Sequence, residues 1–337
     1  MTITYYIIVT LILLICMLAY IPVARRLNII DQPGSRSSHT KPTIRGGGII
    51  FPVALFIWFA YHGFSYPMAT AGLLLIATVS FADDVSGLSG TIRILFHLLA
   101  AAFLFQQMRI FGMHGHLVLA AFVITIGWIN AFNFMDGING ITALYSMVCL
   151  AGFSLVNNAG LYMHIIVPPD QLVTWNPFLE PRFAGTLFFG VLVFFFFNAR
   201  KHARVFAGDV GSVSMAFILA WMMIALMIHT REPGWILFFL VYGIDTVSTI
   251  IIRLYRRENI FEAHRLHLYQ LLANQRKWPH LKVAIIYASL QMVINLATIV
   301  LFFSGMLTWS MVFTLTVFFW IIYIIVRMKL LTAKGVE

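Results

Sequence analysis

Long apolar runs separated by short polar stretches dominate this chain of 337 residues. A helix that crosses a bilayer needs about 17–25 mainly apolar residues. We place eleven such runs, at residues 4–24, 47–63, 66–84, 91–108, 116–134, 140–160, 183–198, 210–230, 235–254, 282–304 and 308–327. The pattern predicts an all-α integral membrane protein. We expect one polytopic domain over residues 1–337, a bundle of about 10–11 transmembrane helices, with ten if one pair is re-entrant.

Composition supports this class. The chain is 61% hydrophobic and only 10% charged, whereas a soluble domain carries about 25% charged residues. No hydrophilic stretch is long enough for a hidden soluble domain. Cys16 and Cys149 lie in apolar runs, which favours packing roles over a disulfide or a metal site. The first run lacks a basic leading segment, so we interpret it as a retained helix rather than a signal peptide.

The polar connections fall into two sets that alternate along the chain. The first set comprises residues 25–46, 85–90, 135–139, 199–209 and 255–281. When residues at helix ends are counted with the nearest connection, this set and the C-terminal tail together hold all of the 22 Lys and Arg residues except Arg109, Arg182 and Arg231. The positive-inside rule makes this set cytoplasmic, with the N-terminus outside and the C-terminus inside. The net charge of +10 is therefore a topology signal and an attraction to anionic lipid, and nucleic acid is not expected as a partner.

Residues 31–48 combine acidic and basic side chains, including His39 and Arg45, with three glycines before a membrane helix. Free backbone N–H groups of Gly46–Gly48 at a helix start would form a phosphate cradle. The alternative is a basic loop that only fixes topology.

Asp83 and Asp84 end the third apolar run. A carboxylate at mid-membrane costs about 2.5–3.5 kcal/mol, so acids near the membrane are candidates for function. Adjacent residues on a helix point about 100° apart, so we expect the two carboxylates to have different tasks. The alternative is a pair of acids facing water, but that position opposes the helix dipole.

Two further polar stretches follow long apolar runs. Asn130, Asn133 and Asp136 recur every three residues, roughly on one helix face, and could bind a nucleobase or ribose or bond between helices. Asn198 begins a connection that ends at Asp209, between two glycines at a helix start. Asp209 is either a magnesium ligand or a helix N-cap.

The basic segment 253–270 contains His264 and His267, three residues apart, among several arginines that include Arg257. Such a cluster favours contacts with phosphate or diphosphate, and the alternative is an amphipathic segment on the lipid surface. Asp245 lies inside the preceding apolar run. A structural ion pair with Arg253 or another basic residue explains it as well as a catalytic role does.

These stretches occur in one order. They are Asp-x-Pro, Arg-x-x-His and Pro-Thr-x-Arg-Gly-Gly within 31–47, Asp-Asp at 83–84, Asn-x-x-Asn-x-x-Asp-Gly at 130–137, Gly-Asp-x-Gly-Ser at 208–212, and Asp-Thr, Arg-Arg and His-x-x-His within 245–267. From about residue 25 to 275, the chain resembles the polyprenyl-phosphate N-acetylhexosamine-1-phosphate transferase family (glycosyltransferase family 4), which includes the phospho-MurNAc-pentapeptide translocase. Its last motif is similar to that of the branch that initiates O-antigen or capsule synthesis.

The resemblance implies a reaction and a set of roles. A UDP-N-acetylhexosamine and undecaprenyl phosphate would give the lipid-diphosphate sugar and UMP, as the initiating step of O-antigen, capsule or teichoic-type glycan synthesis. The enzyme would act at the cytoplasmic face of a bacterial inner membrane. Its metal would be Mg²⁺, with Mn²⁺ as an alternative, and its oligomeric state could be a homodimer. The implied catalytic residues are Asp83, Asp84, Asp209, His264 and His267, with Asp209 and Asp83 on the metal. The implied substrate-binding residues are His39, Arg45, Asn133, Asp136, Asn139, Asn198 and Arg257, with Arg45 ranked below the acids.

One departure from the family pattern concerns position 139, where the family often has Asp and this chain has Asn139. A contact with uridine there would have to come from an amide. The main rival function is a secondary transporter with a polar site on the cytoplasmic side. A lipid phosphotransferase of the CDP-alcohol type and a non-catalytic subunit of a glycan assembly complex fit the motifs less well.

Overall fold

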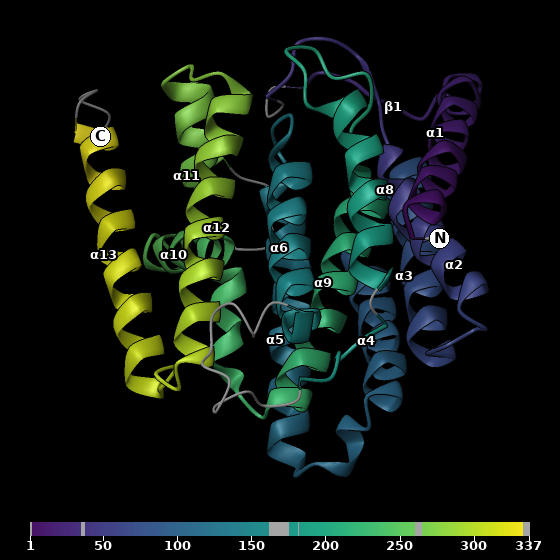
Figure 1. Cartoon of the computed structure of the whole chain (residues 1–337). Coiled ribbons are helices and arrows are strands. Elements are labelled where there is room, and N and C mark those ends of the chain that lie inside the picture. The colour runs from purple at the N-terminus through teal and green to yellow at the C-terminus, as the bar shows by residue number, and fades with distance from the viewer. Residues whose placement is uncertain (1, 35–37, 162–174, 181, 260–264, 333–337) are drawn as a thin grey trace.

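In a computed structural model, the chain forms an all-α polytopic bundle (Figure 1). The structure describes residues 2–34, 38–161, 175–180, 182–259 and 265–332. Within them, eight helices are long and apolar enough to cross a membrane, and three apolar helices are shorter. Each of the eleven predicted runs coincides with one of these helices.

The elements before residue 180 alternate long helices with short turns. They are α1 (Thr2–Arg26), β1 (Ile30–Asp31), β2 (Thr43–Ile44), η1 (Gly47–Ile49), α2 (Ile50–Tyr61), α3 (Pro67–Ser86), α4 (Gly90–Gln107), η2 (Ile110–Gly112), α5 (Gly115–Met135), α6 (Ile141–Asn157) and η3 (Ala159–Leu161).

The elements after residue 180 continue the bundle. They are α8 (Arg182–Asn198), α9 (Gly208–Thr230), η5 (Pro233–Phe239), α10 (Leu240–Tyr255), α11 (Leu268–Gln270), the π-helical turn η6 (Leu271–Gln275), α12 (His280–Phe303) and α13 (Trp309–Thr332).

Local sequence explains several of the helix boundaries. Pro67 occupies the first turn of α3, where its missing N–H costs nothing. Ser89 precedes α4, and its hydroxyl accepts a hydrogen bond from the Ile92 backbone N–H, as an N-cap should. Gly140 takes a positive φ of 85° just before α6, a conformation that glycine adopts without steric cost.

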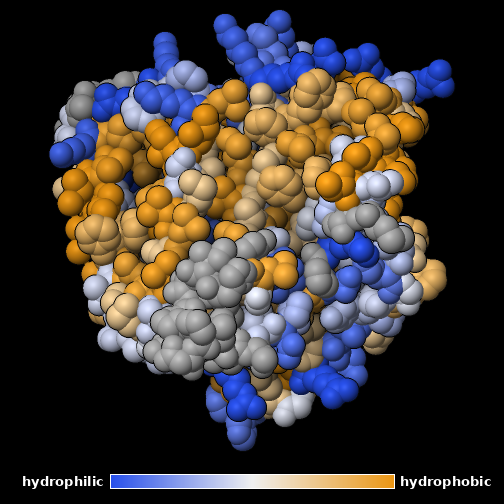
Figure 2. Space-filling model, viewed as in Figure 1, coloured by the Kyte–Doolittle hydropathy of each residue, from blue (hydrophilic) through white to orange (hydrophobic). Residues whose placement is uncertain are grey.

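The surface has the distribution expected of a multi-pass membrane protein. Hydrophobic side chains cover the middle of the face shown in Figure 2, and hydrophilic ones gather above and below it. At the edge of the bundle, α13 packs mainly against α10 and η5 and leaves most of its apolar side chains exposed. Lipid tails solvate such a surface, so its exposure is appropriate for a bilayer.

Helix α9 is the centre of the bundle. Most of its residues are buried, and it packs against α3, α5 and η1. It approaches the glycine turn of η1 so closely that a Cβ atom on Gly48 would overlap the backbone of Gly211. Small residues at such contacts allow helices in membranes to approach closely. The buried helix thus carries Asp209, in its first turn, to a fixed place in the molecule.

Three polar connections meet at one end of the bundle. Strand β1 pairs with β2 in an antiparallel hairpin, and Ile44 of β2 forms a further bridge with Val205 of the α8–α9 connection. Asn139, before α6, bonds to the same connection. Strand β1 lies at the upper end of the bundle in Figure 1, on the same side as the C-terminus. That this end faces the cytoplasm stays a prediction from the distribution of Lys and Arg.

A candidate active site at the start of the central helix

Asp84 holds the N-terminus of α9. Its carboxylate accepts hydrogen bonds from the backbone N–H groups of Asp209 (2.8 Å) and Val210 (3.0 Å). Asp84 lies near the C-terminus of α3, where the helix dipole disfavours a negative charge, but the N-terminus of α9 offers the opposite end of a dipole. The N-cap alternative for Asp209 is therefore wrong: Asp209 lies in the first turn of α9, and a carboxylate from another helix satisfies the N–H groups there.

Arg45 connects two of the acids. Its Nε lies 2.6 Å from Asp84 Oδ1, and its Nη2 lies 3.3 Å from Asp209 Oδ1. Although burial lowers the pKa of Arg45, the charges of Asp84 and Asp209 outweigh it and raise that pKa. Arg45 thus lies between two of the acids, although the motif resemblance ranked it below them.

Asp83 points to different partners from Asp84. Its Oδ2 lies 3.1 Å from Arg93 Nη1, and its Oδ1 accepts a hydrogen bond from the Leu88 backbone N–H. The same Arg93 nitrogen lies 3.8 Å from Asp209 Oδ2. The predicted divergence of the two adjacent carboxylates is confirmed, and Asp209 is the residue that both arginines share.

Asn133 completes this group, which we call the arginine–aspartate cluster: Arg45, Asp83, Asp84, Arg93, Asn133 and Asp209. The Asn133 Nδ2 donates to Asp209 Oδ1 at 3.0 Å and to Ser212 Oγ at 2.8 Å. With its amide nitrogen used in this way, Asn133 fixes the rotamer of Asp209, and its amide oxygen is left as an acceptor.

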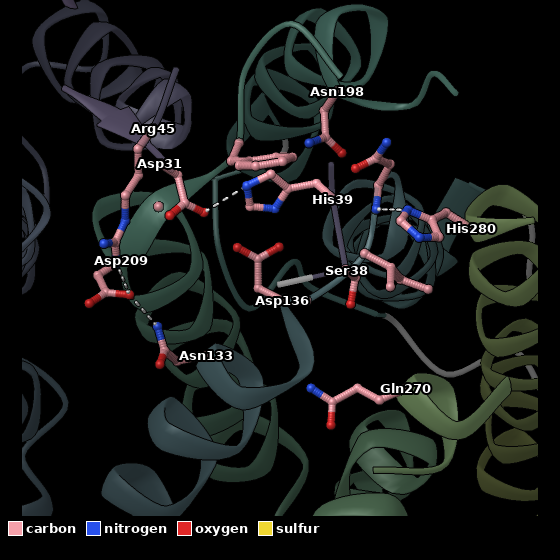
Figure 3. A pocket seen from close by; sticks show the side chains of 15 residues that line it. Asp31, Ser38, His39, Arg45, Asn133, Asp136, Asn198, Asp209, Gln270 and His280 are labelled. Carbon is pink, nitrogen blue, oxygen red and sulfur yellow. Dashed lines mark hydrogen bonds and ion pairs between the residues drawn. The ribbon is translucent and has the colours of Figure 1, made fainter. Parts of the chain in front are cut away.

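A polar cavity of about 440 Å³ opens beside this cluster. Asp209, Arg45 and Asn133 form one side of it, and Asp136 points toward its centre (Figure 3). The Thr142 hydroxyl donates a hydrogen bond to Asp136. Burial is the main cause that raises the pKa of Asp136 to about 6, so its charge changes near physiological pH.

Asn139 and Asn198 line the cavity, but their side-chain amides are engaged in hydrogen bonds with backbone groups of its wall. Asn139 Nδ2 donates to the carbonyl oxygens of Arg200 (2.7 Å) and Lys201 (3.4 Å). Asn198 accepts from the Gly140 backbone N–H at 2.7 Å and donates to the Val205 carbonyl at 2.9 Å. The geometry therefore gives the Asn139 amide a structural task in the α8–α9 connection, and a uridine contact from its Nδ2 would break these bonds.

The glycines 46–48 do not form the predicted phosphate cradle. The Gly47 N–H donates to the Phe206 carbonyl at 2.8 Å, and the Gly48 N–H donates to the Ala207 carbonyl at 3.0 Å. These N–H groups are thus occupied by the chain itself. Gly48 is instead explained by its close approach to the Gly211 backbone of α9, and Gly46 by its positive φ of 78°.

The far side of the cavity is built from two histidines. His39 stacks edge-on against Phe206, with ring centroids 4.8 Å apart, and its Nε2 lies 3.8 Å from Asp31. The first residue of α12, His280, accepts a hydrogen bond at Nδ1 from the Asn139 backbone N–H at 3.3 Å. Its proton is therefore on Nε2 in the neutral form, available as a donor.

The structure brings only part of the basic segment 253–270 to this place. His264 lies outside the described residues. His267 is almost fully buried and bonds to Asp245, and Arg257 is exposed; neither lines the polar cavity. Gln270 lines the cavity instead. The proposed contacts of the two histidines with a diphosphate therefore stay predictions.

The suggested ion pair between Asp245 and Arg253 is wrong. Arg253 Nε lies 3.2 Å from Glu258 Oε2, whereas Asp245 bonds to His267 and to neighbouring hydroxyl groups. Both residues lie in α10, but they are eight positions apart in sequence and more than two helical turns from each other.

The donors around Asp209 fit a divalent cation. Among the described residues, no three His, Cys, Asp or Glu side chains form a metal cluster, but Mg²⁺ is usually bound by one or two carboxylates together with substrate phosphates and water. Asp83 Oδ2 and Asp209 Oδ2 both approach one nitrogen of Arg93, so they flank one position for a positive charge. These residues could therefore hold Mg²⁺, or Mn²⁺, which takes similar oxygen ligands.

Sequence reasoning missed four residues of this region: Arg93, Phe206, Gln270 and His280. Arg93 carried the only usable signal, as a lone cation in the first turn of an apolar helix. The other three are ordinary side chains whose importance depends on which elements meet, and no local pattern marks them.

Comparison with known proteins agrees with this geometry. The model of the family described as glycosyl transferase family 4 matches residues 66–227. A phospho-N-acetylmuramoyl-pentapeptide-transferase of Streptococcus suis is 26% identical over 303 residues, covering 76% of this chain and 84% of its own. The enzyme of that name from Halalkalibacterium halodurans is 25% identical over 302 residues, covering 77% and 85%. The matched segment contains Asp83, Asp84, Asn133 and Asp209, and over this segment the chain is similar to glycosyl transferase family 4.

Proposed function

We propose that the protein transfers an N-acetylhexosamine-1-phosphate from a UDP-sugar to undecaprenyl phosphate and releases UMP. The observation that carries the proposal is the convergence of three aspartates and two arginines beside a polar cavity. An attack of one phosphate on another brings several negative charges together, so positioning and charge neutralisation dominate such a reaction.

The arginines supply mobile positive charge. Arg45 and Arg93 keep 34% and 43% of their side chains exposed, while the aspartates they contact are largely buried. A phosphate that arrives at the cavity would compete with these carboxylates for the guanidinium groups, which bind carboxylate and phosphate in the same geometry. Arg45 lines the cavity and is placed for the diphosphate of a nucleotide sugar. Arg93 lies on the Asp83 side of the cluster, and we assign it to the lipid phosphate.

Mg²⁺ bound to Asp209 and Asp83 would neutralise the diphosphate and stabilise the departing UMP. The chain's own residues prepare that position: Asn133 fixes the rotamer of Asp209, and Asp84 anchors the helix turn that carries it. Asp83 is also a candidate base for the lipid phosphate. Because that phosphate is already mostly ionised at neutral pH, we give more weight to the role of Asp83 in positioning.

A second, apolar cavity suits the lipid chain. It has about 280 Å³, lies among α10, α12 and α13, and is walled by aliphatic and aromatic side chains. Leu268 and Leu272 line this apolar cavity, whereas Gln270, between them in sequence, lines the polar one. The α11–η6 segment thus separates a polar site from an apolar one, as an enzyme that joins a nucleotide sugar to a membrane lipid requires.

The further details follow from the motif resemblance. We propose a UDP-N-acetylhexosamine as the sugar donor, an initiating step of O-antigen, capsule or teichoic-type synthesis as the role, and the cytoplasmic face of a bacterial inner membrane as the place.

The deciding experiment is UMP release by the purified protein from a panel of UDP-sugars, with and without undecaprenyl phosphate and with and without Mg²⁺. We expect release that requires both the lipid and the metal. No release with any UDP-sugar would contradict the proposal, and uptake of a solute into sealed proteoliposomes would instead support the transporter.

A further inference from the structure

Asp245 is a fully buried carboxylate that the mechanism above does not use. Among the described residues, five donors surround it: Tyr287 Oη (2.7 Å), the Leu268 backbone N–H (3.0 Å), Tyr323 Oη (3.1 Å), His267 Nδ1 (3.4 Å) and Thr249 Oγ1 (3.4 Å), the last from the same helix. A buried charge is costly unless hydrogen bonds compensate for it. This arrangement therefore holds several chain segments to one point, which we call the Asp245 cluster: Asp245, His267, Leu268, Tyr287 and Tyr323.

The Asp245 cluster joins a membrane framework to a very short helix. Asp245, Tyr287 and Tyr323 belong to α10, α12 and α13, whereas His267 is the N-cap of α11 and Leu268 is its first residue. α11 has only three residues and continues into the π-helical turn η6. A single turn has too few hydrogen bonds of its own to be stable, so its position depends on outside anchors.

The opposite side of α11 faces the polar cavity. Tyr269 Oη donates to the Phe134 carbonyl at 2.9 Å and packs closely over Gly137, beside Asp136. Gln270 lines the cavity, and its amide nitrogen points into it (Figure 3). Gln270 Oε1 accepts from the His267 backbone N–H at 3.4 Å, which leaves the amide NH₂ as the group presented to a ligand.

We propose that Asp245 is a positioning residue, which holds residues 267–270 so that Gln270 donates a hydrogen bond to the nucleotide sugar. This inference rests on the proposed function. The two tyrosines set the position of Asp245, Asp245 sets the start of α11, and the turn of α11 sets Gln270. Asp245 itself does not touch the polar cavity.

The bonding pattern tells which substitutions separate positioning from folding. Oδ1 accepts from Leu268, His267, Tyr323 and Thr249, whereas Oδ2 accepts from Tyr287. Asp245→Asn can keep its amide oxygen toward the first group, while the Tyr287 hydroxyl turns to accept from the new NH₂. Asp245→Ala removes every bond.

The test measures KM for the UDP-sugar, kcat, and the affinity for UDP by calorimetry, in Asp245→Asn, Asp245→Ala, Gln270→Ala and the double variant Asp245→Ala/Gln270→Ala. Loss of one neutral hydrogen bond predicts a rise of about threefold to tenfold in KM for Gln270→Ala, with kcat less affected. We expect Asp245→Ala to match it, Asp245→Asn to lie between wild type and Asp245→Ala, and the double variant to be no worse than Gln270→Ala alone.

The control is Gln291→Leu, in α12. Gln291 is equally buried and bonds to Tyr145, Asn295 and two backbone groups; it lies about one helical turn after Tyr287 but, among the described residues, has no hydrogen bond to any member of the Asp245 cluster. It should lower the thermal midpoint and leave KM unchanged.

Three results would overturn the inference: KM and UDP affinity that stay at wild-type values in Asp245→Ala, effects that add fully in the double variant, or an equal change in KM for Gln291→Leu. A wild type that turns over no UDP-sugar refutes the proposed function, and the UDP affinities then decide the inference alone. Failure of the wild type to bind UDP would refute both.

Discussion

Buried carboxylates in two clusters of this protein are compensated by different kinds of partner. In the arginine–aspartate cluster, Asp83, Asp84 and Asp209 face guanidinium groups that are partly exposed. In the Asp245 cluster, the carboxylate faces tyrosine hydroxyls, a backbone N–H and a histidine, all of them buried.

This difference in partners indicates which of the two clusters can bind a ligand. An exposed arginine can turn from a carboxylate to a phosphate with little change in free energy, because both partners are anionic oxygens. A backbone N–H or a packed tyrosine has no such freedom, and a missing bond there leaves a buried charge without compensation. The first cluster is therefore suited to exchange partners during a reaction, and the second to keep them.

The largest expected effect is on Asp209. Asp209→Asn should lower the rate of UMP release by at least about 100-fold to 1,000-fold, the cost of removing one preorganised electrostatic group, while the thermal midpoint changes little. The control is Glu180→Gln, which removes the acid of an ion pair with His62 at the other end of α8 and should leave the rate unchanged. Near-normal turnover in Asp209→Asn would refute the metal assignment.

A smaller effect on rate, with a clear effect on stability, is expected for Asp84→Asn. The change weakens the cap of α9 and removes the charge that orients Arg45. We expect a loss of about 0.5–2 kcal/mol in the free energy of unfolding together with slower UMP release.

The matched control for Asp84→Asn is Ser89→Ala, which removes the side-chain cap of α4 without a change of charge. It should lower stability by a similar amount and leave the rate intact. Equal losses of rate in the two variants would mean that Asp84 acts only as a cap.

Asp136 should make nucleotide-sugar binding depend on pH. Because its pKa is raised to about 6, protonation between pH 7 and pH 5 removes a negative charge that faces the diphosphate. We expect the affinity for UDP-N-acetylglucosamine without metal to increase about threefold to tenfold over this range. The UDP-sugar is the right probe, since it lacks a terminal phosphate with a second pKa of about 6.

Asp136→Asn should remove this dependence. Thr142→Val removes a hydrogen bond that lowers the pKa of Asp136, and should move the inflection to higher pH. The same pKa shift also makes stability depend on pH. Because the pKa of Asp136 is higher in the folded state than in the unfolded state, its contribution to the free energy of unfolding is complete below the unfolded-state pKa and is lost as the pH rises through about 6. A pH profile that is identical in Asp136→Asn would assign the titration to another group.

The smallest effect belongs to the Asp245 cluster. Tyr323→Phe removes one donor to the Asp245 carboxylate, and we expect a loss of about 0.5–1.5 kcal/mol in stability with a rise in KM smaller than that of Asp245→Ala. Thermal unfolding and UMP release measure both. A loss of rate as large as that of Asp209→Asn would erase the distinction between the two clusters.

The sequence predicted much of the arginine–aspartate cluster because its chemistry is unusual for a membrane. An aspartate next to an apolar run is costly, so Asp83, Asp84 and Asp209 stood out without any structure. The glycines of residues 46–48 were just as visible, but their purpose was not: the same residues serve an anion site or a tight helix contact, and only the position of Gly211 distinguishes the two.

The residue pattern alone was enough to predict the class of fold, the eleven apolar helices and the candidate acids, because the length of an apolar run and the cost of a charge beside it are local properties of the chain. Only the tertiary structure decided which partners those acids have. Arg45 lies 39 residues before Asp84, Asp209 lies 125 residues after it, and Tyr323 lies 78 residues after Asp245. Hydrogen bonds and ion pairs between such residues depend on how helices pack, and helix packing is set by the whole bundle rather than by any segment of it.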